Sequence, residues 1–189
     1  MKDDATPLPL DHISVNALKV VKRLTEHGFE AYLVGGCVRD LLLGRSPKDF
    51  DVATDAHPEE VRDIFRNSRS IGRRFRIVHI RFGREIVEVA TFRGPHKEID
   101  EDSHSVGGMI LDDNVYGTFE DDVFRRDFTM NALYYNIDSN EILDLVNGQD
   151  DIKAKRIRLI GPPDSRYRED PVRMLRATRF KAKLGFTID

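Results

Sequence analysis

The chain has 189 residues, enough for one domain or for one domain with the start of another, and its 40% hydrophobic and 33% charged residues predict a soluble protein with a buried core. No run approaches the roughly 18–20 apolar residues of a membrane span, and the first residues lack the apolar segment of a signal peptide. The single cysteine, Cys37, excludes an internal disulfide, and the six scattered histidines disfavour a zinc site, so a cytoplasmic location is expected.

Charge is unevenly distributed along the chain, although the formal net charge is only −3. Residues 62–84 hold eight arginines and one acid, and residues 152–189 hold eleven lysines and arginines against four acids. Between these basic blocks, residues 95–122 hold nine acids and one lysine. Two basic blocks around an acidic segment favour a polyanionic substrate beside a metal centre. The alternative for each block is a solvated surface.

The first part of the chain predicts a helix followed by a strand. Residues 1–12 are expected to be a loose lead-in, and Ser14 is expected to cap a helix that ends at Gly28. Residues 29–34 have the composition of a strand. The predicted buried side of the helix consists of Val15, Leu18, Val21 and Leu24.

A glycine turn, Gly35-Gly36, joins this strand to a short helix expected at residues 37–43. A strand that enters a Gly-rich turn and a helix N-terminus offers backbone N–H groups and a positive dipole end to phosphate. Arg39, within the first turns of that helix, is placed to reach the same phosphates. An ordinary turn between a strand and a helix explains the two glycines equally well.

A carboxylate pair stands in the stretch from Lys48 to Val52, where alternation in a strand would put Asp49 and Asp51 on one face. Two carboxylates on one face repel each other, and a hard divalent cation such as Mg²⁺ would relieve that repulsion. The alternative is a solvated edge strand.

A hairpin is predicted further along, from two strand-like runs at residues 75–82 and 85–92. Glu88 interrupts the second run, and a charge inside a buried strand is costly unless it is paired or metal-bound. Glu88 is therefore the expected third metal ligand beside Asp49 and Asp51. Before these runs, Pro58 is expected to open a helix.

The second half begins with the acidic segment, residues 95–122, which is expected to be a mobile loop. A second hairpin at 133–137 and 141–145, a helix at 148–155 and a last short strand at 157–160 should follow. After Pro162-Pro163 a helix is expected, in which arginines recur every third residue: Arg173, Arg176 and Arg179. This arginine row is either a solvated helix face or a surface for nucleotide and RNA.

Five segments, in this order, resemble the motifs of the bacterial tRNA CCA-adding enzymes and poly(A) polymerases: LVGGCVRDLLLG, KDFDVAT, EVATFR, RRDFTMNAL and YREDPVRMLRATRF. The resemblance spans about residues 29–186. It implies an α/β (α+β) fold, in which a polymerase-beta-like nucleotidyltransferase head with a mixed, mainly antiparallel sheet is flanked by helices and followed by the start of a helical neck. The expected division is a lead-in and helix (1–28), a catalytic head (29–163) and the start of the neck (164–189), and the complete protein is expected to continue beyond this chain.

The resemblance also implies roles for the matching residues. Asp49, Asp51 and Glu88 resemble the carboxylates that hold two Mg²⁺ ions. Gly35, Gly36 and Arg39 of the glycine turn resemble residues that meet the triphosphate. In RRDFTMNAL, Arg126, Asp127 and Asn131 resemble residues near the sugar and phosphates of the nucleotide. In the EDxxRxxR element, Asp170, Arg173 and Arg176 resemble residues that read the base, and Arg179 extends that helix face.

The implied reaction is template-independent addition of AMP from ATP to the 3′ end of RNA, with ATP and RNA as partners. Residues 71–79 resemble the GRRF-containing stretch of the poly(A) polymerases, which favours that branch. A tRNA CCA-adding or A-adding enzyme is the first alternative, and a non-catalytic RNA-binding module is the second. The neck helix, expected at 171–184, should expose apolar surface and favour self-association.

Overall fold

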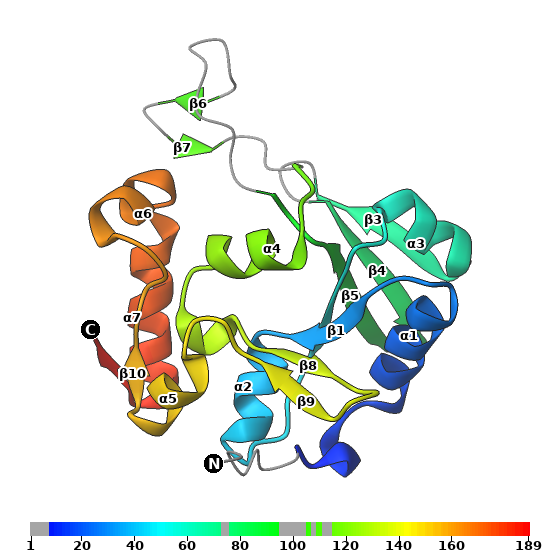
Figure 1. The fold of residues 1–189 in the computed structure, drawn as a ribbon, viewed down its shortest axis with the longest axis horizontal. Coiled ribbons are helices and arrows are strands. Elements are labelled where there is room, and N and C mark those ends of the chain that lie inside the picture. Colours follow the sequence, from blue (N-terminus) through cyan, green and yellow to red (C-terminus); the bar gives the residue numbers. More distant parts are fainter. Residues whose placement is uncertain (1–7, 73–75, 95–104, 107–108, 111–114) are drawn as a thin grey trace.

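The computed structural model describes residues 8–72, 76–94, 105–106, 109–110 and 115–189 of the chain (Figure 1). Seven strands of these residues form one sheet in the order β3-β4-β5-β2-β1-β8-β9. Within this sheet β2 and β5 pair in parallel, and all other neighbours pair antiparallel. A mixed, mainly antiparallel sheet is thus confirmed.

The strands of the main sheet are short. They are β1 (Ala31–Val34), β2 (Phe50–Thr54), β3 (Ser68–Ile71), β4 (Ile77–Phe82), β5 (Glu85–Thr91), β8 (Tyr134–Asn136) and β9 (Glu141–Leu143). Two further strand pairs lie outside it. They are β6 (Ser105–Val106) with β7 (Met109–Ile110), and β10 (Arg156–Ile157) with β11 (Thr187–Ile188).

Most helices of the described residues connect or cover these strands. The α-helices are α1 (Val15–Glu26), α2 (Gly36–Leu42), α3 (Pro58–Ile64), α4 (Phe119–Arg125), α5 (Gly148–Lys153), α6 (Pro163–Glu169) and α7 (Val172–Leu184). Two single 3₁₀ turns are η1 (Leu10–His12) and η2 (Thr129–Asn131). None of the helices in the described ranges has the length and apolar character needed to cross a bilayer.

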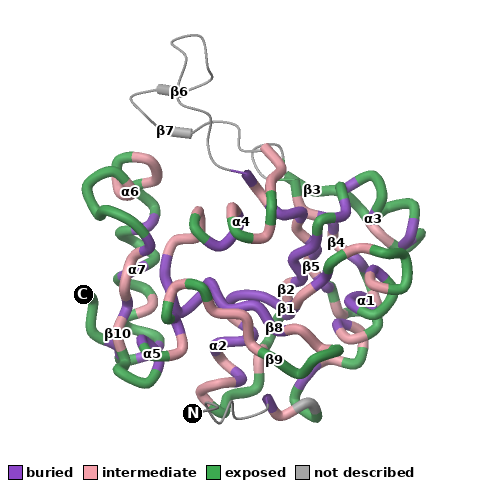
Figure 2. Tube along the Cα trace, in the orientation of Figure 1, coloured by how far each residue is buried: buried purple, intermediate pink, exposed green. Residues whose placement is uncertain are grey.

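The two faces of the main sheet have different coverings because the strands alternate. Leu33, Val52 and Val87 point into the large core with α1, α2 and α3. On the other face Val34 and Ala53 pack beneath α4 in a smaller core. Figure 1 shows α1 and α3 on the side of the strands away from α4, and Figure 2 shows burial concentrated along the central strands. Because α4 covers only part of its face, a hollow remains beside it.

Several predicted elements are confirmed, including the Ser14 cap of α1, whose hydroxyl accepts from the N–H groups of Asn16 and Ala17. The helix face was predicted only in part. Val15 is 64% exposed, and the buried residues are Ala17, Val20, Val21 and Leu24. The first helical residue lies before the helix reaches the core. The lead-in is also less loose than expected, since Leu8 is buried.

The acidic segment was predicted as a loop as far as Asp122, and this is wrong for its last residues. Helix α4 begins at Phe119, where Thr118 and Asp121 form a reciprocal capping box. Acidic residues in a first turn suit the helix dipole, so the charge that suggested a loop stabilises a helix start. Residues 105–106 and 109–110 of the segment also depart from the prediction, because they pair as strands β6 and β7. Residues 95–104, 107–108 and 111–114 lie outside the described residues, as do residues 73–75 of the GRRF stretch.

The C-terminal residues pack onto the head. Ala177, Leu184 and Phe186 join the large core, and the ring of Phe180 lies 5.7 Å from that of Phe128. Strand β10 is shorter than expected, and its parallel partner β11 was not predicted. Helix α7 does expose apolar residues, as expected: Val172, Met174 and Leu175 are 50–72% exposed. Self-association through them stays a prediction.

Candidate active site

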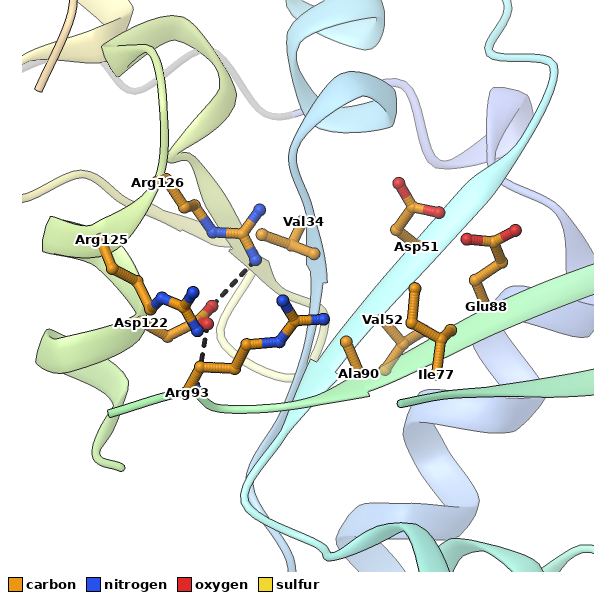
Figure 3. Close-up of a pocket in the computed structure, with 10 residues that line it drawn as sticks. All are labelled: Val34, Asp51, Val52, Ile77, Glu88, Ala90, Arg93, Asp122, Arg125 and Arg126. Carbon is orange, nitrogen blue, oxygen red and sulfur yellow. Dashed lines mark hydrogen bonds and ion pairs between the residues drawn. The ribbon is translucent and has the colours of Figure 1, made fainter. Parts of the chain in front are cut away.

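Asp51 and Glu88 lie side by side at the open part of the sheet. The parallel register of β2 and β5 pairs Asp51 directly with Glu88, and both residues line a pocket of about 260 Å³ (Figure 3). Phe50 and Val52 point to the opposite, buried face. The strand therefore does what the sequence predicted for Asp51: it presents the carboxylate on a rigid surface away from the core.

The electrostatics of Asp51 show that nearby positive charge does not outweigh burial and the charge of Glu88. Burial, and after it the charge of Glu88, raises the pKa of Asp51 to about 6, although Arg126 acts in the opposite direction. Asp49 contributes a smaller increase. Carboxylates whose mutual repulsion resists ionisation are suited to a divalent cation, which removes the repulsion by binding both.

Asp49 takes a different place from the one expected. Strand β2 begins at Phe50, so Asp49 lies in the bend before it and is exposed. Within the described part of the chain, no three Asp, Glu, His or Cys side chains form a cluster that would hold a metal as they stand. Asp51 and Glu88 are suitable metal ligands, and Asp49 lies two positions before Asp51, directly ahead of β2.

Glu88 is less buried than the sequence suggested. Its side chain is 43% exposed, because its face of β5 borders the pocket and not the core. His79, its register partner on β4, places Nε2 at 3.3 Å from Glu88 Oε1. The charge is thus tolerated by exposure and by a histidine neighbour.

Arginines form the opposite wall of the pocket. Arg93 follows β5, and Arg125 and Arg126 end α4, whose Asp122 also lines the hollow (Figure 3). Of these, the sequence interpretation had selected Arg126 alone. The pocket therefore joins two carboxylates on one side to three guanidinium groups on the other, an arrangement suited to a metal-bound polyanion.

Arg126 is firmly held within this wall. Its Nε donates to Tyr134 Oη (2.6 Å) and its Nη2 to Asp122 Oδ2 (2.9 Å), while Tyr134 Oη donates to the same Asp122 oxygen (2.5 Å). Burial alone would lower the pKa of Arg126, but Tyr134 and Asp122 raise it overall. Burial alone would likewise raise the pKa of Asp122, and Arg126 with Tyr134 lowers it. Both groups are charged at neutral pH.

The glycine turn lies next to Arg126. Gly35 has φ +79°, which favours glycine, and its N–H donates to the carbonyl oxygen of Leu133 (3.0 Å). A Cβ at Gly35 would stand 3.7 Å from Arg126 Nη1, and one at Gly36 would stand 3.6 Å from Arg39 Nη2. The turn and the guanidinium of Arg126 thus approach each other closely, as the predicted phosphate site requires.

Arg39 and Asn131 occupy structural positions. Arg39 is only 3% exposed; its Nη1 donates to Asn131 Oδ1 (2.6 Å), and its Nε and Nη2 donate to Asp40 Oδ1. Its guanidinium also lies over the ring of Phe180. These contacts tie α2 to η2 and α7, so a direct phosphate contact, as expected from the sequence, would need these bonds to rearrange.

Three of the four residues expected near the nucleotide base are bonded to other residues of the chain. Arg173 is not part of an exposed arginine row: it is 7% exposed and donates to Glu169 Oε2 and to the carbonyl oxygen of Arg166. Arg176 Nε donates to Asp127 Oδ2 (2.6 Å), which joins α7 to the RRDFTMNAL segment. Asp170 Oδ1 accepts from the Val172 N–H, and Arg179 is exposed. None of these four residues lines the carboxylate pocket.

A second hollow lies at the other end of α4. It measures about 450 Å³ and is lined by Glu30, Asp55 and Glu120 together with aromatic rings, and its lining contains no arginine or lysine. Although it is larger, three carboxylates without a cation would repel a polyphosphate. The smaller pocket with Asp51 and Glu88 is therefore the candidate active site.

Known proteins resemble this chain in sequence and structure. Residues 31–158 match the family described as the poly(A) polymerase head domain. Poly(A) polymerase I of Haemophilus influenzae is 58% identical over 93% of the chain, and a CC-adding tRNA nucleotidyltransferase of Halalkalibacterium halodurans is 38% identical over 95%. Among solved structures, a Bacillus stearothermophilus CCA-adding enzyme in complex with CTP matches 92% of the chain at 37% identity, with a TM-score of 0.76.

The chain spans about two fifths of these relatives, since the matches cover 40% of the Haemophilus protein, 41% of the Halalkalibacterium protein and 40% of the Bacillus structure. The match to the head-domain family covers most of the present chain and includes β1, β2, β5 and α4, the elements that build the pocket. Its fold is the α/β nucleotidyltransferase fold of the CCA-adding enzyme structures. The chain belongs to the poly(A) polymerase head-domain family.

Proposed function

We propose that the complete protein adds AMP from ATP to the 3′ end of RNA without a template. The observation that carries the proposal is the Asp51–Glu88 pair, which faces the arginine wall across one pocket. A nucleotidyl transfer needs both parts: oxygen ligands that hold cations at the reacting phosphate, and cationic groups that receive the negative charge of the triphosphate.

Asp51 and Glu88, with Asp49 directly before β2, would hold two Mg²⁺ ions. Bound there, the metal would supply charge neutralisation at the phosphate and a more acidic RNA hydroxyl. The protein's own part is positioning. The β-strands fix the carboxylates, and α4 fixes the arginines, so little reorganisation is needed when the substrates bind.

The triphosphate is placed by Arg126 and by the Gly35-Gly36 turn next to it. Arg93 and Arg125 complete the wall. Arg39, Asp127 and Asn131 are proposed to act behind the residues that contact the substrate. Arg39 bonds to Asn131, and Asp127 bonds to Arg176 of α7. Their contribution is to hold α2, η2 and the RRDFTMNAL segment in register with the pocket.

Base selection is assigned to Asp170, Arg173 and Arg176, with Arg179 on the same helix. A carboxylate acceptor and planar multiple donors can read the edge of a base, which stacking cannot do. In the present structure Arg173 is bonded to Glu169 and Arg176 to Asp127, so reading a base requires these pairs to open or to share donors.

Adenylate addition is favoured over CCA addition by the degree of similarity. The poly(A) polymerases are 57–58% identical to the chain, against 38–40% for the CC-adding and CCA-adding enzymes. A tRNA nucleotidyltransferase remains the second candidate, supported by the structural likeness to CCA-adding enzymes. Both functions are compatible with the cytoplasmic location expected from the sequence.

The deciding experiment offers labelled ATP or CTP to the full-length protein with an oligo(A) primer and, separately, with a tRNA that lacks its 3′ terminus. Long A tracts on the generic primer are expected. Addition restricted to tRNA, or efficient use of CTP, would support the second candidate. RNA binding without incorporation of either nucleotide would leave a non-catalytic RNA-binding module and would overturn the proposal.

A further inference from the structure

A closed ring of hydrogen bonds joins Arg126, Tyr134 and Asp122. Two of the bonds run from Arg126 to the other two side chains, and the third runs from Tyr134 to Asp122. Tyr134 is fully buried and Asp122 is 6% exposed, so water does not compete for these bonds. The tyrosine ring also lies under the guanidinium, with Arg126 Cζ 4.9 Å from its centroid.

The ring leaves one end of the guanidinium available. Nε and Nη2 are engaged, whereas among the described residues no hydrogen bond from Nη1 is formed. Nη1 is the atom nearest the Gly35 turn on this side chain, 3.7 Å from the position of a Cβ there. Since a guanidinium is planar, fixing Nε and Nη2 fixes the direction of Nη1 as well.

A carboxylate beside a phosphate-binding arginine would ordinarily weaken anion binding by attracting the same cation. Here Arg126 Nη2 donates directly to Asp122 Oδ2, and the Tyr134 hydroxyl bonds to both groups: it accepts from Arg126 Nε and donates to the same Asp122 oxygen. The ion pair therefore occupies Nη2 and the hydroxyl occupies Nε, which leaves Nη1 to face the Gly35 turn. The hydroxyl is the one uncharged member of the ring and can be removed by a change of a single atom.

We propose that Tyr134 is a positioning residue of the active site: its hydroxyl orients Arg126 so that Nη1 meets the triphosphate at the Gly35-Gly36 turn. The inference rests on the proposed use of ATP. Tyr134 does not itself line the pocket, and it acts only through Arg126. A merely structural tyrosine would affect folding and leave recognition of the phosphates unchanged.

The test uses Tyr134→Phe in the full-length protein, with Tyr135→Phe as the matched control. Tyr135 is the next residue of β8 and is also fully buried. Its hydroxyl donates to Asn140 Oδ1 (2.5 Å), and neither residue lines the pocket. Binding of ATP and of AMP is measured with Mg²⁺ for each variant. Since bonds to charged groups contribute more than neutral ones, Tyr134→Phe should weaken ATP binding about tenfold or more. Binding of AMP should be little changed, and Tyr135→Phe should alter neither.

A double-mutant cycle with Arg126→Gln separates positioning from stability. If Tyr134 acts through Arg126, removing the hydroxyl has little further effect once the guanidinium is gone. Equal losses of ATP and AMP binding in Tyr134→Phe, or losses that add fully to those of Arg126→Gln, would overturn the inference. Asp122→Asn, which keeps the shape of the ring, serves as a second variant with the same expected loss of ATP over AMP. A wild-type protein that binds ATP but adds no AMP to RNA would refute the proposed reaction, while the binding comparison would still decide the role of Tyr134.

Discussion

Arg166 on α6 binds the end of the helix that carries the pocket arginines. Its Nη2 donates to the carbonyl oxygens of Arg125 and Arg126, at 2.5 and 2.6 Å, and its Nε donates to the carbonyl oxygen of Ile160 at 3.0 Å. The last carbonyl groups of a helix have no partner within it, and a cation there also suits the dipole. Helix α6 thereby fixes the C-terminal end of α4.

Arg166→Ala should destabilise the protein by about 2 kcal/mol or more, because it leaves carbonyl oxygens without a partner in a partly buried place. Urea unfolding at neutral pH measures the difference. Arg168→Ala, two residues away and exposed, is the matched control and should stay within about 0.5 kcal/mol of the wild type. Equal effects of the two substitutions would show that the contacts of Arg166 contribute nothing specific.

Asp51→Asn should abolish AMP incorporation by the full-length protein and raise the thermal stability of the metal-free protein. The pKa of Asp51 is raised to about 6 in the folded state, above the usual 3.9, so the folded protein binds this proton more tightly than the unfolded chain. That group therefore costs stability as pH rises from about 4 to 6 and beyond. Removing the charge should raise the melting temperature at pH 7.5, by about 2–4 °C for each kcal/mol.

Mg²⁺ provides the companion measurement for Asp51. It should raise the melting temperature of the wild type, because a ligand of the folded state stabilises it, and should have little effect on Asp51→Asn. Near wild-type incorporation by Asp51→Asn would refute the catalytic assignment. A magnesium shift equal in both proteins would place the metal elsewhere.

The contribution of Asp122 to the free energy of unfolding should change with pH in the direction opposite to that of Asp51. Its pKa is lowered in the folded state: burial alone would raise it, and Arg126 and Tyr134 outweigh that effect. Its stabilisation is therefore present above the unfolded pKa near 3.9 and is lost as pH falls through the lower folded value. Asp122→Asn should lower the free energy of unfolding at pH 7, and the gap to the wild type should narrow below about pH 4. A gap independent of pH would argue against a charged Asp122.

The elements that could be predicted from the sequence are those with regular apolar spacing, such as α1, β5 and the β8–β9 hairpin. Strand β3 is exposed and β11 has two residues, so neither carries a periodic signal. The carboxylates were found because Asp49 and Asp51 alternate with apolar residues and because Glu88 interrupts an apolar run. The arginine wall was largely missed, since Arg93 and Arg125 reach the pocket through tertiary packing.

Long-range pairing also explains why roles assigned from motifs differ from the positions observed. Arg39 and Asn131 are 92 residues apart in the sequence, so no local sequence pattern predicts the hydrogen bond between them. The same holds for Asp127 and Arg176, two expected nucleotide contacts that pair with each other in this structure and link α7 to the head. A motif identifies the residues that gather near a site. Which of them contact the substrate directly, and which hold those residues in place, depends on tertiary packing.

Cys37 should resist thiol reagents in the folded protein. It is 2% exposed, and burial, the largest cause, raises the pKa of its thiol to about 12. Alkylation requires a thiolate that the reagent can reach, and neither condition holds. Iodoacetamide at pH 8 should modify Cys37 only after denaturation in guanidinium chloride, as intact mass measurement would show. Rapid labelling of the native protein would mean that α2 opens readily, and with it the glycine turn.

Gly35→Ala should weaken ATP binding by more than it weakens the fold, and Gly44→Ala is its matched control. Both glycines have positive φ, +79° and +66°, so both substitutions strain the backbone. An added Cβ at Gly44 meets nothing within 4 Å, whereas one at Gly35 lies 3.6 Å from the Asn131 carbonyl oxygen and 3.7 Å from Arg126 Nη1. Gly44→Ala should lose about 1–2 kcal/mol of stability, and Gly35→Ala, whose ψ of −125° lies outside the left-handed helical region, should lose at least as much. Only Gly35→Ala should also lose affinity for ATP, since its methyl group occupies the space between the turn and the guanidinium. If both variants bind ATP equally well once folded, the phosphates do not lie at this turn.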